Sequence, residues 1–264
     1  ARVPPDHSRI RKIVQGCFGP RRFKSIEPRI KEIVTRAIDA FAARGSANFF
    51  AEFAYDVPAL VLFKLVGIPD SDVPKVKSWA ISRALLTWAS LSDEEQLPHA
   101  RNMVDYWNYC RDLVAARHAE QTDDLPGDLV RLQKEGAEIT DEEIAGVLYS
   151  VLFAGHETTT TLMANGLREL LTHRKHWDAL VADKSLIPGA IDEILRFSPS
   201  IATWRRRATQ DTEIGGVPIP ANANILLLLA SANRDETVFE QPNAFDIRRA
   251  NARNHLPFGY GIHF

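Results

Sequence analysis

The chain has 264 residues, 45% of them hydrophobic and 25% charged, and a formal net charge of −2 at pH 7. These values fit a soluble globular protein and exclude a disordered chain, and the charge offers no general attraction to nucleic acid or to an anionic membrane. The longest apolar run, residues 225–230, is too short to cross a bilayer, and no targeting segment is visible. With only Cys17 and Cys110, at no metal-ligand spacing, we expect free thiols and a cytoplasmic setting.

The first half of the chain is expected to be helical almost throughout. A helix begins at Pro4-Pro5-Asp6, and within it His7 and Arg11 lie four residues apart on one face. This pair could present two cationic donors to an anion, although a solvated basic face is the more ordinary explanation. The aromatic-rich residues 72–120 are compatible with a lid or with ordinary core packing. Apolar periodicity predicts further helical segments over residues 26–41, 55–66, 72–91, 92–120 and 123–136.

The longest predicted helix covers residues 140–171, and its apolar residues keep the three-and-four spacing of one face throughout. Thr140 and Glu143 form a capping-box pattern at its start. At about 1.5 Å per residue the segment would be on the order of 45 Å long, so we expect it to cross the core.

The middle of this helix, Ala154-Gly155-His156-Glu157 followed by four threonines, breaks the usual preferences. Interior glycine costs roughly 1 kcal/mol relative to alanine, and threonine is a poor helix former. Gly155 would let a flat ligand approach the backbone, and a threonine hydroxyl can bond a carbonyl one turn back. Glu157 and Thr158 beside this gap suit proton transfer in a pocket, and the alternative is a soluble helix with a polar bend. Zinc is excluded, since the second histidine it needs would stand where Thr160 is.

After residue 171 the pattern predicts helices over 173–182 and 187–197 and strands over 208–214 and 225–229, around the turn signals Gly215-Gly216 and 218–222. The expected fold class is mainly α with a small β region. Because the sequence shows no internal repeat and no stretch with the composition of a linker, we interpret residues 1–264 as a single domain. Glu193 and Arg196 lie on one helix face, free to pair with each other and with a distant partner. Two more motifs follow, FDIR at 245–248 and the glycine-containing FGYGIHF at 258–264.

Four of these motifs, in this order and at this spacing, resemble the cytochrome P-450 superfamily of heme-thiolate monooxygenases, especially its soluble bacterial members. They are AGHETT (154–159), EILR (193–196), FDIR (245–248) and FGYGIH (258–263). The resemblance covers essentially the whole chain. It implies the cytochrome P-450 fold, with heme b (iron protoporphyrin IX) as cofactor between the long central helix and a cysteine-bearing loop.

The resemblance also implies roles for individual residues. Glu157 and Thr158 match the acid–alcohol pair over the heme, with Ala154 and Gly155 as the gap where oxygen binds. Phe258 matches the aromatic residue beside the sulfur ligand. A buried, ion-paired structural triad is implied at Glu193, Arg196 and Arg248. Cationic donors to the heme propionates are implied at His7, Arg11, Arg206 and His263.

For the parent enzyme, the resemblance implies insertion of one oxygen atom from O2 into a small hydrophobic or aromatic substrate. Electrons would come from NAD(P)H through a redox partner. This partner would be a ferredoxin, or an FMN and 2Fe-2S reductase fused to the heme domain. Residues 204–207 and GGVPIP (215–220) resemble the bacterial branch that has the fused reductase. No nucleic-acid or membrane partner is expected. An apolar substrate pocket would be lined by Leu86, Val151, Ala154, Ile201, Ala202 and Thr203.

The family's thiolate ligand is expected at the second residue after His263, and this chain stops at Phe264. We therefore expect an internal piece of a longer enzyme, incomplete at both ends and not a competent monooxygenase by itself. Two alternatives remain. A heme-thiolate peroxygenase or isomerase would not need Glu157 and Thr158. A helical interaction module without a cofactor would have no reason for the polar stretch in its longest helix.

Overall fold

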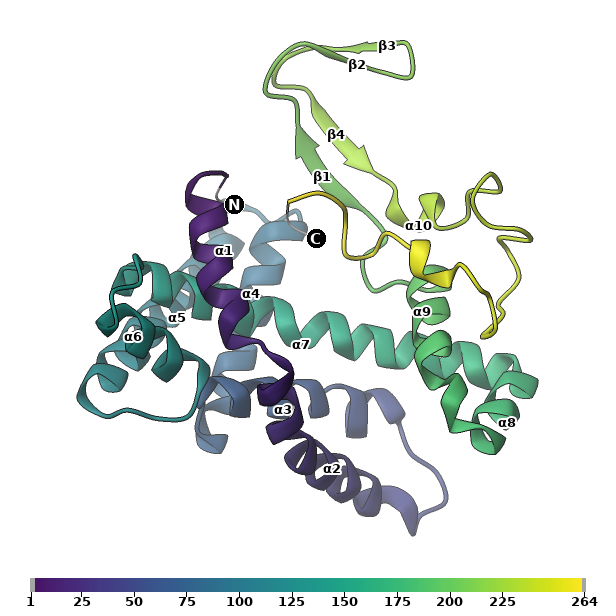
Figure 1. The fold of residues 1–264 in the computed structure, drawn as a ribbon, viewed down its shortest axis with the longest axis horizontal. Coiled ribbons are helices and arrows are strands. Elements are labelled where there is room, and N and C mark those ends of the chain that lie inside the picture. Colours follow the sequence, from purple (N-terminus) through teal and green to yellow (C-terminus); the bar gives the residue numbers. More distant parts are fainter. Residues whose placement is uncertain (1–2, 263–264) are drawn as a thin grey trace. The chain divides into compact units, whose positions relative to one another are not determined.

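The computed structural model describes residues 3–262 and confirms a mainly α fold with a small β region (Figure 1). The chain divides into two compact units, residues 1–160 and residues 161–264. The first unit contains α1 (Asp6–Cys17), α2 (Pro20–Ala42), the π-helical segment η1 (Phe50–Ala54), α3 (Val57–Val66), the 3-10 helix η2 (Asp70–Asp72), α4 (Val73–Trp88), α5 (Asp93–Ala119), α6 (Leu125–Lys134) and the first part of α7 (Asp141–Thr172). The second contains the end of α7, α8 (Arg174–Ala182), η3 (Lys184–Leu186), α9 (Ile187–Phe197), β1 (Trp204–Arg207), β2 (Thr212–Ile214), β3 (Val217–Ile219), β4 (Asn224–Leu227), α10 (Leu229–Ala232) and η4 (Ala252–Asn254).

The core of the first unit forms around α7. Its residues Ile144, Leu148 and Leu152 recur at four-residue spacing and are fully buried. They belong to one apolar cluster with side chains from α3, α5 and α6, including Phe63, Val66, Tyr106, Cys110, Leu125 and Leu129. The long helix therefore runs through the core of this unit, as its apolar periodicity predicts.

The two longest helices begin with reciprocal side-chain caps, and the one at α7 is the capping box that the sequence predicts. At α7 the Glu143 backbone N–H donates to Thr140 Oγ1 (3.2 Å), and the Thr140 N–H donates to the Glu143 carboxylate (3.0 Å). Ser92 and Glu95 form the same reciprocal pair at α5. Glu143 also accepts from the Arg9 guanidinium at 2.7 Å, so this cap ties α1 to the start of α7.

The aromatic residues of α4 have two different environments. Trp79 is 4% exposed and stacks on Tyr106 of α5 with 5.7 Å between ring centroids. Trp88, at the end of the helix, is 43% exposed. The α4–α5 pair is therefore ordinary core packing at Trp79, whereas Trp88 lies outside that core.

The second unit contains two antiparallel ribbons, β1 paired with β4 and β2 paired with β3 (Figure 1). The turn predicted at Gly215-Gly216 is present, and both glycines have positive φ, 59° and 80°, as a tight hairpin requires. The strand predicted over 208–214 is wrong in its first half. The Asp211 carboxylate accepts from the Ala221 N–H at 2.8 Å, which bends this part of the chain, and a strand lies before it, at residues 204–207.

A small apolar cluster supports the second unit. Ala190 and Ile194 of α9 pack with Phe245 and Ile247 from the segment that follows the strands. His176 of α8 donates through Nε2 to the Phe245 carbonyl at 3.0 Å. Among the helices of residues 3–262, none has an apolar stretch of the length that a bilayer span needs.

Candidate functional site

The polar stretch in the middle of α7 lies within an unbroken α-helix. The Thr158 hydroxyl donates a hydrogen bond to the carbonyl oxygen of Ala154, one turn back, at 3.0 Å. This is the threonine-to-carbonyl bond that the sequence predicts, and it forms without breaking the helix. Ala154 itself is exposed. A small side chain and a hydroxyl therefore lie together on one part of the helix surface.

Glu157 precedes Thr158 and is half-buried. Burial raises the pKa of its carboxyl group, and the positive charge of Lys77 on α4 opposes that shift. A carboxyl group with a raised pKa exchanges protons closer to neutral pH than an ordinary glutamate does. The neighbouring acid and alcohol therefore form a pair that is chemically suited to proton transfer.

Gly155 has a packing role that the sequence did not indicate. A Cβ atom at this position would come within 2.9 Å of Leu62 Cδ2, which belongs to α3. The glycine therefore lets α7 lie close to α3. That Gly155 also leaves room for a flat ligand stays a prediction. Ala154 and Gly155 are both exposed.

His156, between these residues, is a core histidine. It is 2% exposed, and its Nδ1 donates to the Leu152 carbonyl at 3.0 Å. Its ring meets Phe63 edge-on at 5.4 Å between centroids. Burial lowers the pKa of His156 to about 4, with a smaller lowering from Lys77 and an opposing contribution from the bond to Leu152. The imidazole is therefore neutral in the folded protein at neutral pH.

We expect acid to destabilise the protein through His156. Its pKa is about 4 in the folded state against 6.5 ordinarily, so the unfolded state binds its proton first as the pH falls. Above the pKa of the unfolded-state histidine, the protein keeps the full contribution of His156 to its stability. As the pH falls from there toward 4, the titration of His156 lowers the free energy of unfolding by roughly 3 kcal/mol. Denaturant unfolding of the full-length protein and of His156→Gln, between about pH 7 and pH 4, measures this loss. Parallel pH curves for the two proteins would show that the histidine does not titrate on unfolding.

Lys77 is a buried cation that the sequence analysis missed. Its side chain is 7% exposed, and its ammonium group donates to Asp56 Oδ1 (2.6 Å) and to the Tyr55 carbonyl (2.8 Å). It also lies 3.3 Å from the centroid of the Tyr55 ring. The signal that could have found it is its place on the buried face of α4, with Val73, Val76 and Ala80, where a lysine is unusual.

The predicted propionate donors lie in both units. His7 and Arg11 are half-buried and one turn apart on α1, in the first unit. Arg206 is exposed on β1, opposite Ile225 of β4, in the second. Phe258 is 63% exposed and meets His255 edge-on at 5.7 Å. The remaining donor, His263, lies outside the described residues.

Glu193 and Arg196 form the buried ion pair that the sequence predicts. Both side chains are fully buried, and the guanidinium donates to the two carboxylate oxygens at 2.7 and 2.8 Å. Arg196 also donates to the carbonyls of Asn233 and Pro242, each at 2.9 Å, and of Ala244 at 3.0 Å. The pair therefore holds the segment around residues 233–244 against α9.

The third member of this network is Arg249 and not Arg248. Arg249 Nε lies 3.2 Å from Glu193 Oε2, and its other nitrogens donate to the carbonyls of Glu240, Gln241 and Ala244. Arg248 is exposed. The physical reason is a turn at Asp246, whose carbonyl accepts from the Arg249 N–H at 3.0 Å and whose own N–H donates to Glu193. In an aperiodic segment, sequence cannot tell which of two adjacent arginines such a turn directs inward.

The predicted lining of the substrate pocket also comes from both units. Leu86 of α4 and Val151 of α7 are half-buried, and Ala154 is exposed, in the first unit. Ile201, Ala202 and Thr203 lie just before β1 in the second unit. The Ala202 carbonyl accepts from the Ala230 N–H at 3.0 Å, which fixes this short segment beside α10. Their common lining of one pocket stays a prediction.

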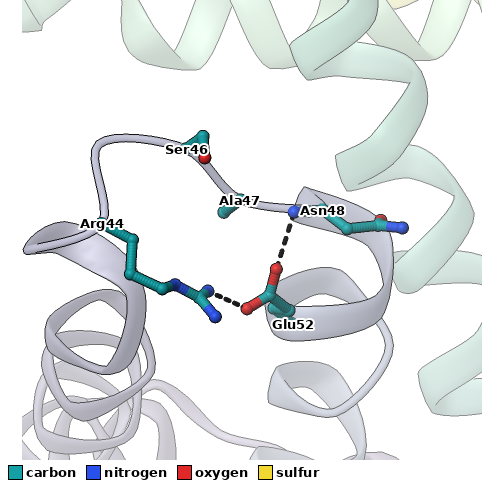
Figure 2. A pocket seen from close by; sticks show the side chains of 5 residues that line it. All are labelled: Arg44, Ser46, Ala47, Asn48 and Glu52. Carbon is teal, nitrogen blue, oxygen red and sulfur yellow. Dashed lines mark hydrogen bonds and ion pairs between the residues drawn. The ribbon is translucent and has the colours of Figure 1, made fainter.

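A surface pocket lies elsewhere, between the end of α2 and η1 (Figure 2). Its lining residues are Arg44, Ser46, Ala47, Asn48 and Glu52. The Glu52 carboxylate accepts from the Asn48 N–H at 2.7 Å and pairs with the Arg44 guanidinium, as Figure 2 shows. Because these polar groups satisfy one another and no predicted site residue lines the pocket, we do not assign the chemistry to it.

The family model for cytochrome P450 matches residues 2–264. The chain belongs to the cytochrome P450 family. It is 35% identical to erythromycin C-12 hydroxylase of Saccharopolyspora erythraea, over 99% of this chain and 66% of that protein. It is 36% identical to the cytochrome P450 monooxygenase PikC of Streptomyces venezuelae, over 99% of this chain and 62% of that protein. The chain thus spans slightly less than two thirds of these relatives.

Solved structures of cytochrome P450s are also similar to this chain. Cytochrome P450 CREJ in complex with (4-ethylphenyl) dihydrogen phosphate has a TM-score of 0.96 and 52% identity, over 100% of this chain and 66% of that one. An intact type IV self-sufficient cytochrome P450 monooxygenase has a TM-score of 0.92 and 34% identity, over 99% of this chain and 34% of that one. Both the fold and the motif-based family assignment are therefore confirmed.

Membership of the cytochrome P450 family implies a heme cofactor. The donor set of the first unit fits such a group. His7 and Arg11 place an imidazole and a guanidinium one turn apart on α1, and two such hydrogen-bond donors suit the two carboxylates of a heme. Ala154 on α7 is small and exposed, which suits contact with a flat apolar ring.

Proposed function

We propose that this cytochrome P450 chain is the heme-binding part of a monooxygenase that inserts one oxygen atom from O2 into a small aromatic substrate. The observation that carries the proposal is the pairing, on an unbroken α7, of a half-buried glutamate of raised pKa with a hydroxyl residue beside an exposed alanine. A peroxygenase or an isomerase would not need the pair of Glu157 and Thr158. Their presence therefore favours a reaction that consumes protons.

The residues of the chain take the following roles in this proposal. His7 and Arg11, with Arg206 and His263, would hold the heme through its carboxylates. When bound, heme supplies the binding and activation of O2. Glu157 takes up protons from solvent and releases them toward the space beside Ala154. Thr158 holds a hydroxyl donor at that space, where it currently donates to the Ala154 carbonyl.

A small aromatic substrate is supported by two observations. The residues proposed to line the pocket are apolar apart from Thr203. The structure of CREJ, which is 52% identical to this chain, contains (4-ethylphenyl) dihydrogen phosphate, a compound with a single aromatic ring. We therefore propose 4-ethylphenyl compounds as the first substrates to test.

Electrons would come from NAD(P)H through a redox partner. Ferredoxin and a fused FMN and 2Fe-2S reductase are both compatible with the chain. The structural likeness to a type IV self-sufficient monooxygenase supports the fused arrangement, at 34% identity.

Labelled oxygen tests the proposed reaction. The heme-loaded full-length protein, with a surrogate redox partner and NADPH, is incubated with a 4-ethylphenyl substrate under 18O2. We expect a product that contains one 18O atom, and no label when 18O is supplied only as water. Product that forms with hydrogen peroxide but not with O2 and NADPH would instead establish a peroxygenase.

A further inference from the structure

We propose that Arg83 of α4 binds an anionic group of the substrate, so that this cytochrome P450 selects small aromatic compounds bearing a phosphate or a carboxylate. This inference rests on the proposed function and names the substrate class of the same site. It is carried by a half-buried guanidinium that lies against α7 without an acidic partner in the described residues.

The side chain of Arg83 is held by two aromatic rings of α7. Its guanidinium carbon lies 4.4 Å from the ring centroid of Tyr149 and 4.4 Å from that of Phe153. One of its nitrogens donates to the Tyr149 carbonyl at 2.8 Å. These contacts fix the plane of the guanidinium, which is the preorganisation that bidentate recognition of an anion requires.

No protein carboxylate neutralises this charge in the part of the chain that the structure describes. Of the five N–H groups of a guanidinium, only one nitrogen of Arg83 is engaged there, with a neutral carbonyl. Its charge acts on Tyr106, Cys110 and Tyr149, whose pKa values burial raises, so these three groups are neutral at pH 7. A half-buried cation among aromatic rings and neutral groups is costly unless an anion accompanies it.

The position of Arg83 along α7 matches the proposed site. Tyr149, Phe153 and Glu157 follow one another at four-residue spacing on α7. Glu157 is one helical turn, about 6 Å along the axis, beyond Phe153. A molecule with one aromatic ring has a similar length. Its anionic group can therefore pair with Arg83 while its other end reaches the surface near Ala154.

The charge of the ligand is the first variable to test. The heme-loaded full-length protein is titrated calorimetrically with 4-ethylphenyl phosphate, 4-ethylbenzoate and 4-ethylphenol. This compares two anions with a neutral compound that has the same 4-ethylphenyl group. We expect the better anion to bind roughly tenfold to hundredfold more tightly than 4-ethylphenol, the range for hydrogen bonds to a charged group. Whether phosphate or carboxylate binds better identifies the preferred anion. Equal binding of all three compounds would overturn the proposal.

The second variable is the cation. Arg83→Gln should lose most of the preference for anions and bind 4-ethylphenol within about twofold of the unaltered protein. Arg83→Lys should keep part of the preference, because it keeps the charge without the planar fork. Arg101→Gln, at an exposed arginine of α5, is the matched control and should change nothing. If Arg83→Gln weakens the anions and the phenol equally, Arg83 is only a structural contact between α4 and α7.

Two further measurements keep the result interpretable. Heme content and melting temperature identify a variant that fails to fold, in which case Arg83→Lys and the ligand series on the unaltered protein decide. Binding by calorimetry needs no turnover. A protein that prefers anions but incorporates no 18O would therefore contradict the monooxygenase proposal and leave the role of Arg83 intact.

Discussion

Replacing Glu193 with alanine is expected to destabilise the full-length protein by roughly 3–5 kcal/mol, the cost of breaking a buried ion pair by removing one partner. The Glu193 side chain is fully buried and accepts from Arg196, from Arg249 and from the Asp246 N–H. Without it, Arg196 would remain fully buried with only carbonyl oxygens as partners. Because whole domains are stable by only about 5–15 kcal/mol, much of the variant should fail to fold around heme.

The two adjacent arginines supply a matched control for this prediction. Arg248→Ala removes an exposed side chain and should change the unfolding free energy by less than about 0.5 kcal/mol. Arg249→Ala should cost about 1–3 kcal/mol, because Glu193 keeps Arg196 but loses one charged donor. Denaturant unfolding and heme content of the three variants measure these effects. A Glu193→Ala protein that melts near the unaltered protein and loads heme normally would refute the structural role of the network.

Replacing Thr158 with alanine is expected to lower the product formed per NADPH oxidised by roughly tenfold to hundredfold, which reaches the low end of the contribution of a positioned proton donor. The hydroxyl acts after the substrate is bound, so substrate affinity should change little. NADPH oxidation should continue, while product falls and hydrogen peroxide rises. Stability should stay the same or rise by a few tenths of a kcal/mol, because alanine is the better helix former.

The neighbouring acid should give a different result. Glu157→Gln keeps the size of the side chain but cannot exchange a proton, so the whole cycle, including NADPH oxidation, should slow by about 10²-fold. Thr158→Ser, which keeps the hydroxyl, is the control and should stay mostly coupled. Product formed per NADPH oxidised, measured in all three variants, separates the two roles. Unchanged coupling in Thr158→Ala would mean that the hydroxyl only satisfies the Ala154 carbonyl.

Arg248 and Arg249 show where the sequence alone cannot decide which of two adjacent residues makes a contact. Within a helix, the period of 3.6 residues fixes which side chains share a face, so Glu193 and Arg196 could be paired from their spacing alone. The segment after Phe245 has no such period, and the third partner lies 56 residues from Glu193. A single turn at Asp246 decides which arginine reaches the carboxylate.

Gly155 and Arg83 show a second kind of limit. The sequence shows that a glycine stands in an unfavourable place, but its neighbour Leu62 lies on another helix, 93 positions earlier in the chain. From the sequence, Arg83 is one more charged residue in an amphipathic helix, and only the structure places its guanidinium 4.4 Å from the ring centroids of both Tyr149 and Phe153. Both environments arise from packing between helices, which local spacing does not specify.

The sequence by itself determined the features that depend on nearby residues. These are the long helix with its Thr140–Glu143 cap, the hairpin turn at Gly215-Gly216, the Glu193–Arg196 pair and the family-specific order of motifs. Only the tertiary structure decided the burial of Lys77, the close contact of Gly155 with Leu62, the choice of Arg249 and the stacked position of Arg83. The physical reason is distance along the chain: helical periodicity and capping act within a few residues, whereas these contacts join segments 21 to 93 residues apart.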